Sequence, residues 1–146
     1  MDDSKALRSG LGHVRVGVDM ADVATVSDAL DRFGDRYRQR VYTPAEIAYC
    51  TDQTTPLTEA ERFAARFAAK EAVIKLLQPD RDHVDWRSIE VQRHNTGWCS
   101  IVLRDGAAEL AQRCGVTDIS LSLSHERGLA VAVAAALITG ESNNAH

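Results

Sequence analysis

The longest predicted helix of this chain has the sequence TEAERFAARFAAKEAVIKLL, residues 58–77. Thr58 and Glu61 form a capping box, in which each side chain satisfies a free backbone amide of the first turn. Pro79 ends the helix near Leu77, because proline cannot continue it. This helix also carries the charged residues on which the functional prediction depends.

Within residues 66–75, four charged residues interrupt the apolar pattern of the helix: Arg66, Lys70, Glu71 and Lys75. Residues three or four positions apart lie on the same side of a helix, so several of these charges fall close together. A helix that buries an apolar stripe seldom carries a carboxylate and an ammonium beside it without a partner or a ligand. One carboxylate among several cations is the arrangement that a metal-bound anionic substrate requires.

Strands and shorter helices are predicted on both sides of this helix. The alternating residues 14–18 predict a strand that ends at Asp19, and apolar positions between 20 and 33 follow helical spacing up to Gly34. Thr43-Pro44-Ala45-Glu46 is a second capping box and predicts a short helix. The remaining predictions are strands at about 87–93 and 98–103, a helix at 105–114, and strands at about 119–124 and 129–138, with His125 in the last turn.

Composition and charge exclude several classes of protein. The 146 residues fit one domain, which we place at 13–139 between a flexible extension (1–12) and a flexible tail (140–146). The formal charge of −4 argues against non-specific binding to nucleic acid. No apolar run reaches the roughly 20 residues of a membrane span, and no signal-peptide profile is present. Because the three cysteines are scattered, we expect no disulfide framework or zinc site, and a cytoplasmic location.

Two carboxylates from distant parts of the chain are candidates for a metal site. Asp19 follows a strand, and Glu71 lies in the long helix with Lys75 one turn later. Magnesium is usually held by one or two protein carboxylates, while water and substrate phosphates complete its shell. Cations beside such carboxylates balance the charge of a polyphosphate and of a transferred phosphoryl group. The residues therefore favour metal-assisted chemistry on a phosphate ester or anhydride.

Each of these residues also has a purely structural interpretation. Asp19 is well placed to cap the helix that follows it. Glu71 and Lys75 form an i,i+4 pair of the kind that is common on solvated helix faces. A histidine such as His125 is more often a turn residue than a catalyst.

Four motifs occur in a characteristic order and at characteristic spacing. They are Gly17-Val18-Asp19-Met20, Arg40-Val41-Tyr42-Thr43-Pro44-Ala45-Glu46, Arg66-Phe67-Ala68-Ala69-Lys70-Glu71-Ala72 with Lys75, and Ser122-Leu123-Ser124-His125-Glu126 with Ala130. Together they resemble holo-acyl-carrier-protein synthase, the short single-domain class of 4′-phosphopantetheinyl transferases. The third motif is highly specific, whereas Gly-x-Asp or Ser-x-Ser-His alone is weak. The resemblance extends from about residue 14 to residue 137.

The resemblance implies a fold, an assembly and a reaction. The fold is α+β, with an antiparallel sheet against which one long helix packs, and family members are typically homotrimers with active sites between subunits. The reaction transfers 4′-phosphopantetheine from coenzyme A to a serine of an apo acyl carrier protein and releases adenosine 3′,5′-bisphosphate. Fatty-acid or polyketide biosynthesis is the expected setting, and neither nucleic acid nor a membrane is an expected partner.

The family's functional residues match positions of this chain. Asp19 and Glu71 would bind magnesium, which also binds the pyrophosphate of coenzyme A. Lys75 would reach the phosphates, and either Glu71 or a metal-held water would take the serine proton. The residues expected to contact coenzyme A are Arg66, Lys70, Lys75 and His125, with Arg66 and His125 toward its 3′-phosphate and adenine.

The first departure from the family pattern concerns the carrier protein. Thr25 stands where the family usually has an arginine that contacts the acidic carrier. Arg32, Arg36 and Arg40 offer a substitute patch. The aspartates that interleave with them weaken its field, and a salt-bridged exposed helix is the structural interpretation of these arginines.

Two further departures lie beyond the long helix. Residues 78–83 replace a glycine-rich stretch that allows close backbone approach to the ligand, and the acidic side chains of Asp80 and Asp82 would be unfavourable beside a pyrophosphate. Gly97-Trp98-Cys99 replaces a Gly-x-Pro, which we interpret as a packing change.

Two functional hypotheses follow from these observations. The first is a magnesium-dependent phosphopantetheinyl transferase, specialised for one dedicated carrier protein. The second is a non-catalytic relative that binds coenzyme A or a carrier protein without transfer. The departures at Thr25 and at 78–83 favour the second hypothesis, and the intact residues of the four motifs favour the first.

Overall fold

The structure is a computed structural model, which describes residues 12–52, 57–81 and 83–139. The predicted flexible extension (1–12) and flexible tail (140–146) lie outside the described residues except for Gly12. Asp82 lies outside them as well. Along the described chain, no helix is both long and apolar enough to cross a lipid bilayer.

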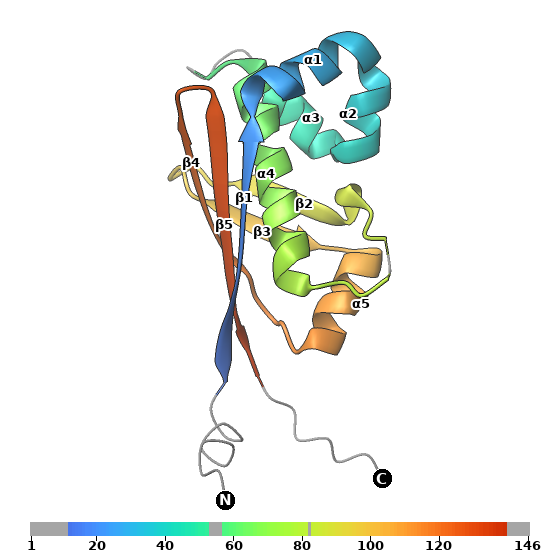
Figure 1. The fold of residues 1–146 in the computed structure, drawn as a ribbon, viewed down its shortest axis with the longest axis vertical. Helices are drawn as coiled ribbons and strands as arrows, with labels where there is room; N and C mark the ends of the chain where they lie inside the picture. Colours follow the sequence, from blue (N-terminus) through green and yellow to red (C-terminus); the bar gives the residue numbers. More distant parts are fainter. Residues whose placement is uncertain (1–11, 53–56, 82, 140–146) are drawn as a thin grey trace, which may run out of the picture.

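A five-stranded sheet forms one layer of the molecule, with the strand order β1-β5-β4-β3-β2 and antiparallel pairing throughout. Its strands are β1 (His13–Asp22), β2 (Ile89–Arg93), β3 (Cys99–Leu103), β4 (Ser120–Glu126) and β5 (Leu129–Ile138). Figure 1 shows β1, β5 and β4 as long neighbouring strands. The predicted α+β class and the antiparallel sheet are confirmed.

Helices cover one face and one end of this sheet. They are α1 (Val23–Phe33), α2 (Asp35–Val41), α3 (Pro44–Thr51), α4 (Glu59–Leu77) and α5 (Asp105–Cys114), with a 3-10 turn η1 (Trp86–Ser88). α4 runs along β1 and β5, α1 to α3 gather near one end of it, and α5 lies toward the other end (Figure 1). The three cysteines carry free thiols.

Small residues bring β1 and α4 into very close contact. Ala68, Ala69 and Ala72 of α4 are fully buried. A Cβ atom at Gly17 would overlap the backbone carbonyl oxygen of Ala72 and lie 2.9 Å from the amide of Leu76. Only glycine permits this approach, so Gly17 fixes where β1 crosses α4. The crossing places the next inward-facing residue of β1 beside the last turns of α4.

The two predicted capping boxes are confirmed. Thr43 accepts a hydrogen bond from the amide of Glu46, and the Glu46 carboxylate accepts one from the amide of Thr43 at 2.9 Å. Thr58 and Glu61 do the same at the start of α4. These motifs are local in sequence, which explains why they could be recognised without the fold.

Two predicted boundaries at the ends of β1 and β4 are wrong. β1 does not end at Asp19 but continues to Asp22, because it pairs with β5 along its whole length. Asp22 caps α1 by accepting a hydrogen bond from the Ala24 amide at 2.8 Å, so the interpretation of Asp19 as this cap is also wrong. His125 lies in β4 opposite Ala130 and not in a turn.

The turn between β4 and β5 is shorter than the sequence pattern indicated. Arg127 and Gly128 both have positive φ, 52° and 77°. Two consecutive residues of this kind form the tight hairpin turn that matches the twist of the strands. The strands therefore extend up to Glu126 on one side and Leu129 on the other.

Candidate functional site

The junction of β1 and α4 brings two of the predicted site residues together. The ammonium of Lys75 lies 2.9 Å from Asp19 Oδ1 and donates a second hydrogen bond, of 3.0 Å, to the carbonyl of Val18. The Asp19 side chain is only 17% exposed, whereas that of Lys75 is 56% exposed. The partner of Lys75 is therefore Asp19, and the predicted alternative of a Glu71–Lys75 pair on a solvated face is not what the structure shows.

Glu71 lies one helical turn before Lys75, on the same side of α4. Its side chain is half-buried, and its Oε1 accepts a hydrogen bond of 2.7 Å from the indole of Trp86. Because Lys75 reaches Asp19 and follows Glu71 by four residues, both carboxylates lie along the same edge of the β1–α4 junction. The sequence did not point to Trp86, although an indole N–H beside a polar loop needs an acceptor when it is buried.

Lys70 lies in the protein core. Its ammonium lies 2.7 Å from Glu46 Oε1, with both side chains fully buried, and it also donates to the carbonyls of Trp86 and Ile89. Burial lowers the pKa of Lys70, and the negative charge of Glu46 opposes that shift. The burial and these three contacts argue against a contact between Lys70 and coenzyme A, which stays a prediction.

Glu46 extends this buried pair into three elements. Besides capping α3, its carboxylate accepts a hydrogen bond of 3.0 Å from the amide of Val91 in β2. The pair thus connects α3, α4 and β2. The sequence identified Glu46 as a capping residue, but not as the counter-ion of Lys70, because the two residues are 24 positions apart.

Arg66 is also buried and lies on a different side of α4 from Glu71. Its guanidinium lies 4.0 Å from the centre of the Tyr49 ring, and Nη1 donates to the carbonyl of Arg62. Its Nε has no hydrogen-bond partner among the described residues. A contact between Arg66 and coenzyme A therefore stays a prediction.

His125 is exposed and does not join the two carboxylates. Its partner Ala130 is opposite Ala21 of β1, two residues after Asp19, so His125 shares the inner face of the sheet with Asp19. Two strand spacings separate β4 from β1, which corresponds to about 10 Å. The predicted contact between His125 and coenzyme A stays a prediction.

The residues at the junction fit a magnesium ion. Asp19 and Glu71 stand on two rigid elements, and one Glu71 oxygen makes no hydrogen bond or ion pair within the described chain. The described residues contain no group of three or more histidine, cysteine or acidic side chains that could hold a metal. Magnesium does not need such a cage, because it keeps several waters and binds through one or two carboxylates.

The segment that replaces the glycine-rich stretch keeps one feature of glycine. Gln78 caps α4 in the left-handed conformation, with φ 50° and ψ 57°. Glycine is the usual residue there, since it adopts this conformation without strain. The chain therefore leaves α4 in the same left-handed backbone conformation that a glycine at this position would adopt. Asp80 is exposed in the loop that follows.

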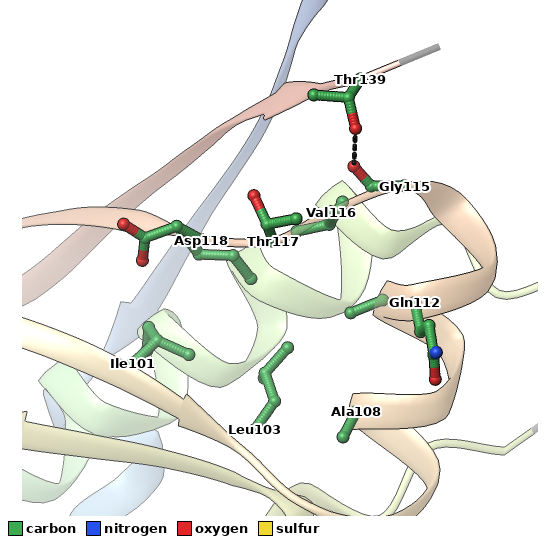
Figure 2. Close-up of a pocket in the computed structure, with 11 residues that line it drawn as sticks. Ile101, Leu103, Ala108, Gln112, Gly115, Val116, Thr117, Asp118 and Thr139 are labelled. Atoms are coloured by element: carbon green, nitrogen blue, oxygen red, sulfur yellow. Dashed lines mark hydrogen bonds between the residues drawn. The ribbon is translucent and has the colours of Figure 1, made fainter. Parts of the chain in front are cut away.

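Two cavities of the molecule have neither Asp19 nor Glu71 among their lining residues. One of about 380 Å³ lies between α5, β3 and residues 115–119 (Figure 2), and contains none of the predicted site residues. A second, of about 540 Å³, lies beside Trp86 where α2 faces α4. Its lining residues are Phe33, Arg36, Tyr37, Arg40, Val41, Phe67 and Trp86.

Comparison with known proteins matches residues 15–134 to the 4′-phosphopantetheinyl transferase superfamily. A holo-[acyl-carrier-protein] synthase of Koribacter versatilis is 43% identical over 80% of this chain and 91% of its own length. One from Solibacter usitatus is 40% identical over 82% of this chain and 94% of its own. A solved structure from Chronobacterium ammoniagenes, an ACPS–CoA complex, has a TM-score of 0.75 and 28% identity, and covers 88% of this chain and 99% of that one.

Proposed function

This chain belongs to the 4′-phosphopantetheinyl transferase superfamily, and we propose that the junction of β1 and α4 is its catalytic site. The protein transfers 4′-phosphopantetheine from coenzyme A to a serine of an apo acyl carrier protein, and adenosine 3′,5′-bisphosphate is released. The observation that supports our site assignment most is the 2.9 Å contact between Lys75 and Asp19, with Glu71 one helical turn before Lys75 on the same side of α4. The family membership favours the transferase over a non-catalytic relative.

Asp19 and Glu71 are the residues that we assign to magnesium. A bound ion there would neutralise the charge that builds on the pyrophosphate oxygens during transfer. Asp19 is held by the sheet, and Glu71 by the middle of a 19-residue helix. Rigid elements of this kind hold both carboxylates in place before the substrate arrives, which reduces the cost of organising the site.

Lys75 is the residue that we assign to the phosphates of coenzyme A. Its side chain is more than half exposed, and an ion pair in such a position contributes little free energy. Lys75 can therefore turn from Asp19 to an incoming pyrophosphate at small cost. Either Glu71 or a water held by the metal would act as the general base that takes the serine proton.

The carrier protein is proposed to dock on the exposed arginines of α1 and α2. Arg32 lies on α1, while Arg36 and Arg40 lie on α2 after the break at Gly34. None of the three takes part in an ion pair within the described residues, and Asp35 pairs with Arg38 instead. The predicted salt-bridged helix is thus not formed, and the free cations suit an acidic partner.

A homotrimer is proposed from the outer face of the sheet. Val14, Val16, Val18 and Met20 alternate with the inward-facing residues of β1, and Met20 is 62% exposed. On β5, Val133 and Leu137 are exposed on the same face, where they pair with Val18 and Val14. Contiguous apolar surface of this kind marks an interaction site.

The experiment that tests the transfer uses a panel of apo carrier proteins. Each is incubated with the protein, coenzyme A and magnesium, and its mass is then measured. A gain of one phosphopantetheine unit on at least one carrier is expected. Transfer rates that differ between carriers of fatty-acid, polyketide and peptide pathways would support one dedicated partner. Equal transfer rates would contradict that hypothesis. No gain on any carrier would contradict the transferase.

A further inference from the structure

We propose that Trp86 is a positioning residue, which fixes the Glu71 carboxylate in the orientation that presents its free oxygen to the metal. The proposal rests on the catalytic site proposed above. Its basis is the 2.7 Å hydrogen bond from the indole Nε1 of Trp86 to Glu71 Oε1. An indole can only donate, so this bond engages one of the two oxygens of the Glu71 carboxylate.

Trp86 is itself anchored at several points. Its backbone carbonyl accepts a hydrogen bond of 2.9 Å from Lys70, whose ammonium is fixed by the buried Glu46. Its ring packs against Phe67, with 6.1 Å between ring centres. A donor held at both its backbone and its ring has little freedom to follow Glu71, and so it restricts the rotation of that carboxylate.

The arrangement explains why a buried lysine directly precedes the proposed metal ligand. Lys70 and Glu71 bind the same tryptophan, one through its carbonyl and the other through its indole. The buried Glu46–Lys70 pair is thus connected to Glu71 through the backbone carbonyl and the indole of one residue, Trp86. Groups that hydrogen-bond a metal ligand from behind typically contribute about 10- to 100-fold in metal affinity or activity.

The first test replaces each tryptophan of the chain by phenylalanine. Trp86→Phe keeps a ring against Phe67 but removes the donor to Glu71. Trp98→Phe is the matched control, because Trp98 is exposed in the β2–β3 hairpin and stacks on His94. We expect Trp86→Phe to raise the metal concentration for half-maximal transfer by about tenfold or more. The KM for coenzyme A at saturating metal should change less, and the control should match the wild type.

A second test measures metal binding without catalysis. In the Trp98→Phe protein, Trp86 is the sole tryptophan, because the chain contains two. Its fluorescence should change when manganese or magnesium is added together with coenzyme A, and Glu71→Gln should abolish the metal-dependent part of the change. This measurement leaves Trp86 intact and therefore remains informative if Trp86→Phe fails to fold.

The outcomes separate this proposal from the proposed function. Unchanged metal requirement in folded Trp86→Phe, or a Trp86 signal that does not respond to metal, would overturn the positioning role while transfer itself stands. Transfer to no carrier, together with a metal-dependent Trp86 signal that needs Glu71, would overturn the transferase and support the positioning role.

Discussion

The ammonium of Lys75 and the carboxylate of Asp19 are 2.9 Å apart, where α4 and β1 cross. In the free protein this contact occupies one of the two proposed metal ligands with a cation from the neighbouring element. Coenzyme A and the metal would separate the pair, since the pyrophosphate attracts Lys75 and the ion attracts Asp19. In the free protein, the Lys75 ammonium thus lies where the metal would bind Asp19 in the substrate complex.

Replacing Lys75 by methionine should have opposite effects on catalysis and on metal binding. Loss of a cation that stabilises charge in the transition state should reduce kcat/KM by about 10²-fold or more. Asp19 would lose its competing partner, so metal binding without coenzyme A should become tighter. Steady-state kinetics and manganese titration measure the two effects, and Lys75→Arg is the control that retains the charge. Weaker metal binding in Lys75→Met would contradict this assignment.

Gly17 should tolerate no side chain. A Cβ atom there overlaps the Ala72 carbonyl, and backbone atoms cannot move aside as a flexible side chain can. Gly17→Ala should lower the free energy of unfolding by about 1–3 kcal/mol and displace Asp19 from Lys75. Gly106→Ala is the matched control, because a Cβ at this helical position meets no neighbour. Denaturant unfolding should show the control unchanged or slightly more stable. Equal effects of the two substitutions would contradict the close contact.

Substitutions of Lys70 and of Lys75 should differ in their effect on the free energy of unfolding. Lys70→Met leaves the carboxylate of Glu46 buried without its cation, which should cost about 3–5 kcal/mol in the free energy of unfolding. Lys75→Met removes an exposed ion pair and should change that free energy by less than about 1 kcal/mol. Chemical denaturation of both variants provides the comparison. If Lys70→Met were stable but raised the KM for coenzyme A, Lys70 would be a ligand contact after all.

The outer face of β1 should determine the oligomeric state. Met20→Glu places a charge in the middle of the exposed apolar strip, so it should convert a trimer into a monomer. Trp98→Glu is the control, as Trp98 is an exposed apolar residue far along the chain in a different hairpin. Light scattering after size-exclusion chromatography gives the molar mass of each. A wild-type monomer, or a trimer that survives Met20→Glu, would exclude this face as the interface.

Local signals in the sequence predicted much of the fold. The capping boxes at Thr43 and Thr58 are confirmed because each satisfies backbone groups within four residues. The β4–β5 hairpin was also found, since its turn carries a glycine between apolar runs. The strand ends were not, because the length of β1 is set by its pairing with β5, whose residues lie over a hundred positions away.

The predicted site could be recovered only in part for a similar reason. The motifs indicated Asp19, Glu71 and Lys75; the fold brings Lys75 against Asp19, and Glu71 lies one helical turn before Lys75. They could not show that Lys70 points into the core, because neighbouring helix residues differ by 100° in direction and the buried partner Glu46 is distant in sequence. Trp86 was missed because its role depends on a long-range contact with Glu71.

The central claim is that Asp19 and Glu71 together support phosphopantetheine transfer. The most direct measurement is the mass of an accepted apo carrier protein after incubation with coenzyme A, magnesium and each variant. Asp19→Ala and Glu71→Ala should both abolish the gain of one phosphopantetheine unit, whereas Asp118→Ala, beside the α5 cavity, should retain it. Transfer at the wild-type rate by either of the first two variants would contradict the account.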